Sequence, residues 1–430
     1  GAIDKLPSSL FALPGLRDAI PTEVITLHRL LGTRPNSRQF RHNARNPLAL
    51  DVLVVDEASM VDLEMMAAML SALPAQARLV ILGDKDQLAS VEAGSVLGEL
   101  CKRAREGHFD KRTQEWIERI TQEKIDVSLI DPEGSALDQC IVMIRRSHRF
   151  TASSGIGQLA EAVNSGESNR IEQVWQHGYV DLLKHDLKAI NDAEFDAIIL
   201  GSASKQDDVG ERKGYAHYLS VMTREEPPIV ASATDFDDWA RQVLAAHSQF
   251  QILSALRNGP YVVTGLNQRI FESLAKRKLI ASSLPWYQGR PVLVTRNDYR
   301  LGLMNGDIGI TLRYPRVDKQ NGDLSCVTRV AFPKSDGSNG IHWVLPSRLQ
   351  ATETVFALTV HKSQGSEFEH CALILPPFRN PVLTRELVYT GITRAKKWFS
   401  LVNLGNPKMI FEAAAQRVQR AGGLFVSEKP

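Results

Sequence analysis

A strand, a helix and a second strand follow one another near the start of the chain. Residues 50–56, LDVLVVD, are apolar at adjacent as well as alternating positions, which is typical of a parallel strand buried on both faces. Residues 62–73 carry apolar side chains at helical spacing, and Asp62 is placed to cap that helix. Residues 77–84, ARLVILGD, form a second apolar run. Such strand–helix–strand units build parallel sheets, so the sequence predicts an α/β fold.

Length and composition narrow the class of protein. A chain of 430 residues is too long for one ordinary domain, so we expect two or three. The net charge of +2 neither indicates nor excludes a nucleic-acid partner. The four cysteines lie far apart without a C-x-x-C pair, as in the reduced thiols of a cytoplasmic protein. Because no apolar run reaches the roughly 20 residues that cross a bilayer, we expect no membrane contact.

The pattern changes in the second half of the chain. Short β-like runs between residues 289 and 349 are separated by turn sequences, which favours a small antiparallel barrel. The turn sequences are Asn305-Gly306-Asp307, Asn321-Gly322-Asp323 and Asp336-Gly337-Ser338. Buried strands return after Thr354, so the barrel is predicted to be inserted into a second α/β domain. Residues 102–136 are predicted to be a peripheral excursion and residues 165–250 mostly helical, with a loop at 224–228.

Two carboxylates end the first strand. Ligands of open α/β sheets sit beyond the carboxyl ends of the strands, where Asp56 and Glu57 lie. Such a pair suits nucleotide hydrolysis, with Asp56 holding Mg²⁺ and Glu57 polarising the attacking water. The alternative is that both acids only cap the following helix. Gln87, after the second strand, could contact the γ-phosphate or orient water, or could belong to a polar surface loop.

Two arginine-containing segments could stabilise a phosphate from a facing domain. In residues 144–150, IRRSHRF, we favour Arg149 because Ile144 and Phe150 are expected to pack beside it. In residues 384–397, TRELVYTGITRAKK, helical spacing places one apolar, two small and one basic residue on a single face, which suits an arginine held across a close-packed surface. That face comprises Leu387, Thr390, Gly391 and Arg394. Alternatively, Arg145 and Arg146 could be solvated, and Arg394 could be an arginine of an ordinary surface helix.

Residues 357–376, ALTVHKSQGSEFEHCALILP, combine a strand end with a polar turn. Hydroxyls, amides, His361 and a lysine are suitable donors to a phosphate backbone, and Gly365 allows close backbone approach. Glu367 could accept a hydrogen bond from a ribose hydroxyl. The alternative is a plain polar turn between two strands.

Taken in order, these segments and two more, TLHRLLG at 26–32 and NGDIG at 305–309, resemble the motifs of superfamily 1 DNA helicases. The chain is most similar to the RecD branch, the alpha subunit of exonuclease V, over most of residues 20–405. The resemblance implies two RecA-like parallel-sheet motor domains. The first, incomplete, would be residues 1–145 and the second 146–285 with 350–430, with an SH3-like barrel inserted at 286–349.

The resemblance also implies ATP and Mg²⁺ as cofactors and assigns roles by position. The nucleotide set is Asp56 (holding Mg²⁺), Glu57, Gln87, Arg149, Glu367 and Arg394, of which Glu57, Gln87, Arg149 and Arg394 would be catalytic. The DNA-contacting set is Thr26, His28, Thr359, His361 and Ser363. A motor of this family moves 5′ to 3′ along single-stranded DNA and acts with RecB and RecC in double-strand-break repair and recombination.

The family's P-loop, G-x-x-x-x-G-K-[ST], has no match before residues 26–32. Either these residues are the C-terminal part of a longer chain, or the protein has lost ATP hydrolysis. Glu57, Gln87, Arg149 and Arg394 would have little reason to persist together in a dead motor, which favours the first explanation. We therefore expect an ATP-dependent DNA helicase whose 430 residues alone hydrolyse little or no ATP. The alternatives are a stand-alone RecD-like helicase and a non-hydrolysing DNA-binding or scaffold subunit.

Overall fold

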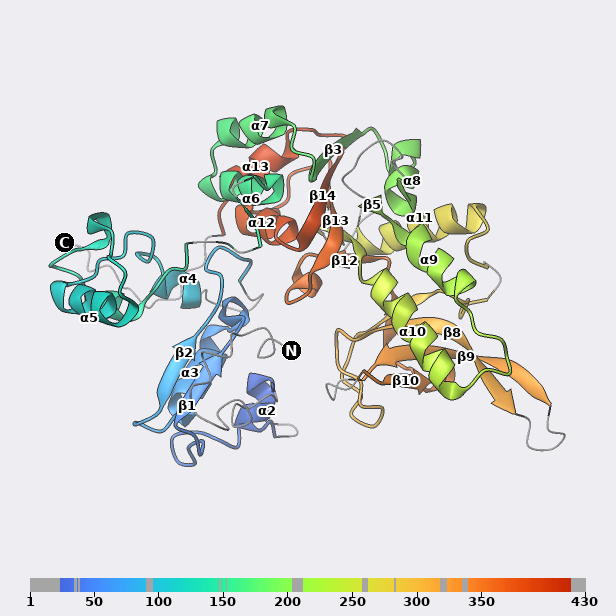
Figure 1. Cartoon of the computed structure of the whole chain (residues 1–430), viewed down its shortest axis with the longest axis horizontal. Helices are drawn as coiled ribbons and strands as arrows, with labels where there is room; N and C mark the ends of the chain where they lie inside the picture. The colour runs from blue at the N-terminus through green and yellow to red at the C-terminus, as the bar shows by residue number, and fades with distance from the viewer. Residues whose placement is uncertain are drawn as a thin grey trace. The chain divides into compact units, whose positions relative to one another are not determined.

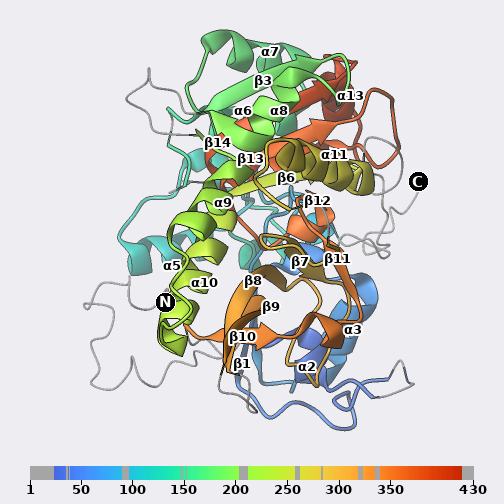
Figure 2. The same ribbon diagram turned by 90° about the vertical axis from the view of Figure 1, so that its right-hand side faces the viewer.

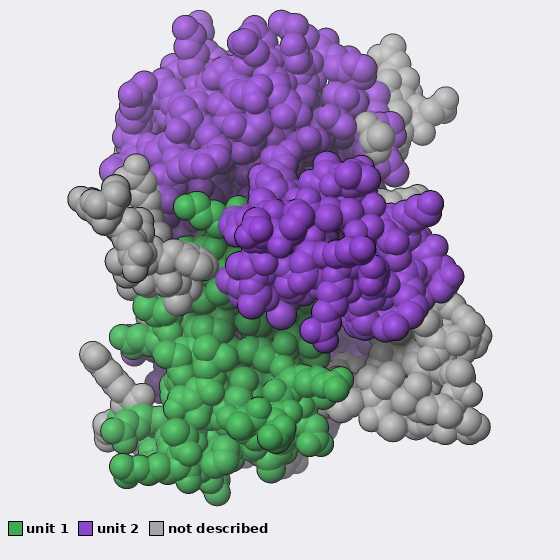
Figure 3. All heavy atoms as spheres, turned by 90° about the vertical axis from the view of Figure 1, so that its left-hand side faces the viewer, with its two compact units in different colours: residues 1–84, 89–102, 420–430 green, residues 85–88, 103–419 purple. Residues whose placement is uncertain are grey.

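The computed structural model describes residues 24–418, except for 35–36, 38, 90–95, 146, 148, 152, 203–211, 257–261, 282–283, 318–322 and 335–338. Contacts divide the chain into two compact units (Figure 3). The first comprises residues 1–84, 89–102 and 420–430, and the second comprises 85–88 and 103–419. The domain boundary predicted at residue 145 stays a prediction.

The first unit contains the predicted strand–helix–strand segment. Strand β1 (Val52–Val55) is followed by α3 (Leu63–Ala72) and β2 (Arg78–Ile81), and the two strands pair in parallel. Asp62 caps α3 as predicted, because its Oδ1 accepts a hydrogen bond from the backbone N–H of Met65 at 2.8 Å. The shorter elements of this unit are α2 (Leu27–Leu31), η3 (Ala58–Met60) and α4 (Val96–Leu100).

The prediction that these strands are buried on both faces is wrong for the part of the unit that the structure describes. Val54 is 57% exposed and Val80 is 42% exposed, whereas Val55 is 5% exposed and lies in the core with Met69 of α3. Among the described residues, helices pack on one face of this two-stranded sheet, so an apolar run of parallel-strand type presents its other face to solvent.

A five-stranded parallel sheet forms the centre of the second unit, in the order β12-β6-β13-β14-β3 (Figures 1 and 2). The strands are β12 (Ala357–Thr359), β6 (Phe250–Ser254), β13 (Phe368–Leu375), β14 (Ala395–Leu404) and β3 (Leu182–Leu187). The buried strands predicted after Thr354 are thus confirmed, and with the parallel pair of the first unit they confirm the α/β class.

Helices cover both faces of this sheet (Figure 1). Along β13, Ala372 and Ile374 pack on one side, and Cys371, Leu373 and Leu375 pack on the other. The first side is covered by α8 (Ala193–Leu200), α9 (Tyr215–Arg224), α10 (Ala233–His247) and α11 (Val263–Lys276). The second is covered by α6 (Gly155–Ser165), α7 (Ser168–His177), α12 (Arg385–Ile392) and α13 (Met409–Ala415). This is the arrangement of a doubly wound sheet.

The mostly helical segment 165–250 also supplies an edge strand. Among the described strands, β3 pairs with β14 alone, and its end residues Leu182 and Leu187 are buried while the residues between them, three of them polar, are more exposed. An edge position needs few apolar residues, which is why the sequence did not reveal this strand. The predicted loop at 224–228 is confirmed, because α9 ends at Arg224. A short antiparallel pair, β4 (Gly201–Ser202) and β5 (Arg212–Lys213), completes this region.

The predicted β-rich region forms a five-stranded antiparallel sheet, in the order β10-β9-β8-β7-β11. Its strands are β7 (Pro291–Val294), β8 (Ile308–Val317), β9 (Leu324–Pro333), β10 (Ile341–Val344) and β11 (Thr352–Thr354). Gly306 in the turn before β8 has a φ of +101°, which glycine tolerates. The other two predicted turns fall wholly or partly outside the described residues. The sheet packs on α10, where Trp343 Nε1 donates to Asp237 at 2.6 Å. Its closure into a barrel stays a prediction.

Residues 103–145, most of them from the predicted excursion, form a small polar subdomain in the second unit. It contains α5 (Lys111–Thr121), none of whose residues is buried, and two short turns, η4 (Val127–Leu129) and η5 (Asp138–Cys140). Arg103 Nη1 lies 3.0 Å from Asp138 Oδ2, and His108 Nδ1 lies 2.8 Å from Asp131 Oδ2. Across the described residues, no helix combines the length and the apolar character that crossing a membrane requires.

Candidate active site

The two carboxylates of the first unit lie in a strained turn. Glu57 follows β1 with a φ of +52° and a ψ of +38°, a left-handed conformation that is uncommon for residues other than glycine and that clusters at functional sites. Asp56 Oδ1 accepts from the N–H of Glu57 at 2.8 Å. The turn is tied to the end of β2, because Ala58 N donates to Leu82 O at 3.0 Å. The backbone of this turn thus fixes the Cα positions from which the Asp56 and Glu57 side chains extend.

Asp56 fits the role of a ligand for the implied metal. Its side chain is exposed, and one carboxylate oxygen is oriented by the bond to Glu57 N. No group of three or more His, Cys, Asp or Glu side chains suited to a metal occurs among the described residues. Mg²⁺ in phosphate-transferring proteins is commonly held by only one or two carboxylates, with phosphates and waters completing the shell, so a single aspartate fits.

In the second unit, Glu367 accepts from two cations. The Arg149 guanidinium forms an ion pair with Glu367, and Lys396 Nζ lies 3.1 Å from its Oε2. Arg149 Nη1 also donates to the carbonyl of Thr393 at 3.1 Å. All three charged side chains are partly exposed, so solvent weakens the pairs but a ligand can reach them. Lys396, the second residue of β14, was missed from the sequence, because no local pattern places it beside Glu367.

Arg394 occupies a different environment, because it is only 3% exposed. It lies beyond the end of α12, and its Nε donates to Thr390 O at 3.1 Å. Its Nη1 donates to Ser366 O at 3.2 Å. The helical face on which it was predicted is buried, and a Cβ at Gly391 would lie 3.0 Å from Leu373 Cδ2. Arg394 therefore links the end of α12 to the residue preceding Glu367.

The expected setting of Arg149 is partly wrong. Ile144 is 84% exposed and gives no packing, whereas Phe150 packs against the core beside α6, with the Arg149 guanidinium 5.7 Å from its ring centroid. Arg149 is therefore held by polar partners and not by an apolar pocket. Glu367 and Arg394 precede β13 and β14, at the amino ends of these strands, opposite to the edge where ligands of open sheets usually bind.

Gln87 belongs to the same unit as the arginines. Residues 85–88 group with the second unit. Both backbone polar groups of Leu88 form hydrogen bonds with side chains of that unit. Its N–H donates to Thr390 Oγ1 at 2.8 Å, and its carbonyl accepts from Gln364 Nε2 at 2.6 Å. The second unit therefore contains Gln87 together with Arg149, Glu367 and Arg394, while Asp56 and Glu57 belong to the first.

The residues predicted to contact DNA largely shape their own turns. Ser363 is fully buried and donates to Val360 O at 2.8 Å, and Thr359 Oγ1 accepts from Lys362 N at 3.2 Å. His361 is half-buried. In the first unit, Thr26 caps α2 by accepting from Arg29 N at 3.3 Å, and His28 is exposed. Contact of these residues with DNA stays a prediction, and the buried Ser363 hydroxyl would reach a phosphate only if the turn opened.

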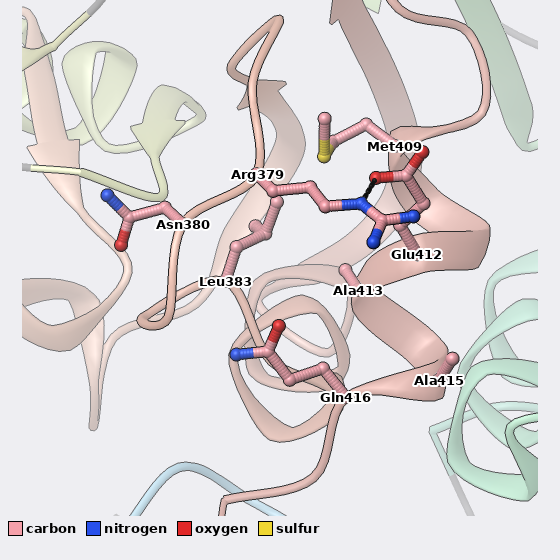
Figure 4. Close-up of a pocket in the computed structure, with 8 residues that line it drawn as sticks. All are labelled: Arg379, Asn380, Leu383, Met409, Glu412, Ala413, Ala415 and Gln416. Atoms are coloured by element: carbon pink, nitrogen blue, oxygen red, sulfur yellow. Dashed lines mark hydrogen bonds and ion pairs between the residues drawn. The ribbon is translucent and has the colours of Figure 1, made fainter.

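A pocket of about 260 Å³ lies beside α12 and α13 (Figure 4). Arg379 Nε and Glu412 Oε2 pair across it at 2.6 Å. Its remaining lining residues are Asn380, Leu383, Met409, Ala413, Ala415 and Gln416. None of the predicted site residues lines this pocket, so it is not assigned to the nucleotide.

Two segments of the chain match models of known protein families, and several curated proteins are similar to most of it. Residues 12–93 match the model of an AAA domain, and residues 354–402 match that of a UvrD-like helicase C-terminal domain. The RecBCD enzyme subunit RecD of Haemophilus influenzae is 36% identical over 413 residues, covering 95% of this chain and 59% of that protein. The RecD subunit of Mycobacterium tuberculosis (strain H37Rv) is 33% identical over 400 residues, covering 93% and 57%.

Two further likenesses are more distant. The ATP-dependent RecD2 DNA helicase of Deinococcus radiodurans is 27% identical over 406 residues, covering 93% of this chain and 42% of that protein. The crystal structure of the Pif1 helicase from Bacteroides with ADP-AlF3 and single-stranded DNA has a TM-score of 0.39 at 14% identity, covering 90% of this chain and 80% of that one.

The matched segments and the α/β fold support a superfamily 1 helicase chain. Relatives at 30–36% identity over most of this chain support the RecD branch of that superfamily. The chain spans 59% of the length of the first of these relatives.

Proposed function

We propose that the protein containing this chain is an ATP-dependent helicase that translocates 5′ to 3′ on single-stranded DNA during double-strand-break repair and recombination. The observation that carries the proposal is the gathering of Gln87, Arg149, Glu367 and Arg394 in one unit, with polar bonds linking the segments that hold them. These are the residue types that phosphoryl transfer requires, and they come from four separate parts of the chain.

In this proposal the carboxylates and the arginines each have a role in nucleotide hydrolysis. Asp56 would hold Mg²⁺, which would supply charge neutralisation at the phosphates when bound. Glu57 accepts a proton from the attacking water, and Gln87 orients that water or contacts the γ-phosphate. Arg149 and Arg394 stabilise the negative charge of the transition state. Glu367 accepts a hydrogen bond from a ribose hydroxyl, and Lys396 stays paired with the Glu367 carboxylate.

DNA binding is assigned to two segments. Thr26 and His28 would contact DNA in the first unit, and the turn carrying Thr359, His361 and Ser363 would contact it in the second. The antiparallel sheet would form an SH3-like barrel. Because such contacts displace counterions from the phosphates, binding should weaken steeply with salt.

The relatives favour two assemblies. Those named as RecD subunits of the RecBCD enzyme support an assembly with RecB and RecC, which we prefer because their identity to this chain is higher. The relative named as an ATP-dependent RecD2 DNA helicase supports a protein that acts without them. Purification of the full-length protein with its endogenous partners separates the two, since a protein recovered alone and active on DNA would favour the second.

The test of hydrolysis is Glu57→Gln in the full-length protein. This variant should lose about 100-fold or more of DNA-stimulated ATP hydrolysis, which is the usual contribution of a general base, and should keep its affinity for single-stranded DNA. The matched control is Glu64→Gln, at an exposed glutamate in the first turn of α3. Undiminished hydrolysis by Glu57→Gln would refute the assignment, and an inactive wild-type protein would refute the helicase proposal itself.

A further inference from the structure

Leu88, the residue after Gln87, is held by side chains at both of its backbone polar groups. Thr390 Oγ1 accepts from its N–H at 2.8 Å, and Gln364 Nε2 donates to its carbonyl at 2.6 Å. Leu88 is 3% exposed and packs in the core beside α6 and α12. Because a buried backbone group without a partner is costly, both bonds strongly favour one position of this segment.

The two side chains come from functionally different segments. Gln364 ends the short η7 turn (His361–Ser363), which carries predicted DNA contacts. Thr390 lies in the last turn of α12, where its carbonyl accepts from Arg394 Nε at 3.1 Å. Its hydroxyl also donates to Glu386 O at 2.7 Å, so its direction is fixed. Any shift of the η7 turn or of the helix end is therefore transmitted to Leu88 and to the neighbouring Gln87.

We propose that Gln364 and Thr390 are positioning residues that place Gln87 for hydrolysis in response to DNA. Gln364 connects Leu88 to the DNA-contacting turn, and Thr390 connects it to the segment of Arg394. The inference rests on the proposed function. It adds a physical route between the two sites, made of two side-chain hydrogen bonds to one residue. Neither residue need touch nucleotide or DNA.

A purely structural role would have different consequences. If these bonds only stabilised the fold, their loss would lower the thermal midpoint and reduce basal and DNA-stimulated hydrolysis in proportion. If they position Gln87 in response to DNA, their loss reduces the ratio of stimulated to basal hydrolysis while the affinity for DNA is retained. The ratio is therefore the informative quantity.

The experiment uses the full-length protein with oligodeoxythymidine as the DNA probe. Gln364→Met and Thr390→Val remove the two hydrogen bonds with little change in shape, and Thr390→Ser keeps the hydroxyl. The control is Thr311→Val, at a fully buried threonine of β8 whose hydroxyl has no hydrogen-bond partner among the described residues. For each variant we measure kcat with and without DNA, the Kd for DNA and the thermal midpoint.

The two hydrogen-bond-deleting variants should lower the stimulation ratio by roughly three- to thirty-fold, the range expected for residues that couple two sites. Thr390→Ser and Thr311→Val should keep the wild-type ratio, and the Kd for DNA should change less than about two-fold. The double variant should lose little more than the larger single effect, because both bonds act on Leu88. Wild-type ratios in both Gln364→Met and Thr390→Val, or an equal loss in Thr390→Ser, would overturn the inference. Absence of DNA-stimulated hydrolysis in the wild type would instead overturn the proposed function, and the inference with it.

Discussion

Acid should destabilise the second unit through His370. This residue lies on β13 and is 4% exposed, with Nδ1 2.9 Å from Lys213 O and Nε2 2.8 Å from Ser400 Oγ. A neutral ring satisfies both neighbours by donating from Nδ1 to the carbonyl and accepting the hydroxyl at Nε2. Burial lowers the pKa of His370 to about 4 from 6.5, and Arg212 and His185 also lower it, whereas the bond to Lys213 O raises it.

The size of the effect follows from proton binding in the two states. Between pH 6.5 and pH 4 the unfolded chain holds a proton on this histidine and the folded chain does not, so the unfolding free energy falls as the pH falls. For pKa values of about 4 and 6.5 the loss from pH 7 to pH 5 is about 2 kcal/mol. His370→Gln removes this titration, so its unfolding free energy should fall by about 2 kcal/mol less over the same interval.

Tryptophan fluorescence is a suitable measurement, because all six tryptophans lie within the second unit. Urea titrations at pH 7 and pH 5 give the unfolding free energy of each variant. His177→Gln, at an exposed histidine near the end of α7, is the control and should behave as wild type. If His370→Gln showed the same loss between the two pH values as wild type, the assignment of this acid sensitivity to His370 would be refuted.

Two further predictions concern the arginines and the lysine. Arg394→Ala should lower both hydrolysis and the unfolding free energy, the latter by about 3 kcal/mol or more, because it removes buried charged donors from two carbonyls. Arg149→Ala should lower the unfolding free energy by about 1 kcal/mol or less. Urea titration of both variants beside the ATPase assay checks this, and equal stability losses would contradict it. Lys396→Met should raise the KM for ATP up to about five-fold with kcat unchanged, because Glu367 loses one of its two cations. The control is Lys397→Met, whose lysine pairs with Glu369 instead. Steady-state kinetics in which both variants behaved alike would contradict the prediction.

The sequence predicted those elements whose determinants are local. The helix of residues 62–73 formed because its spacing and its Asp62 cap act within one turn, and β13 after Thr354 formed because it contains a continuous apolar run at residues 371–375. Strand β3 was missed because three consecutive polar residues, 184–186, interrupt its apolar pattern, which an edge position tolerates. The exposure of Val54 could not be predicted, because whether a face is covered depends on residues far away in the sequence.

The same distinction holds for the candidate site. Residue types and order made Glu57, Arg149 and Arg394 candidates, which they remain, but the sequence could not show that Glu367 is shared between Arg149 and Lys396. That contact joins the segment before α6 to the starts of β13 and β14, more than 200 residues apart. The link from Leu88 to Thr390 spans a similar separation and was likewise invisible.

The two arginines that the sequence treats as equivalent differ in a way that bears on mechanism. Arg394 is fixed by backbone carbonyls on two sides and is almost fully buried, so its charge is preorganised and needs no rearrangement to act. Arg149 is partly exposed and pairs with a carboxylate, a partner that a phosphate can replace with the same donor geometry. Lys396 can keep Glu367 neutralised when that exchange occurs, so the exchange leaves no carboxylate without a cation. One arginine is therefore a fixed part of the proposed site, and the other is able to report the arrival of a phosphate.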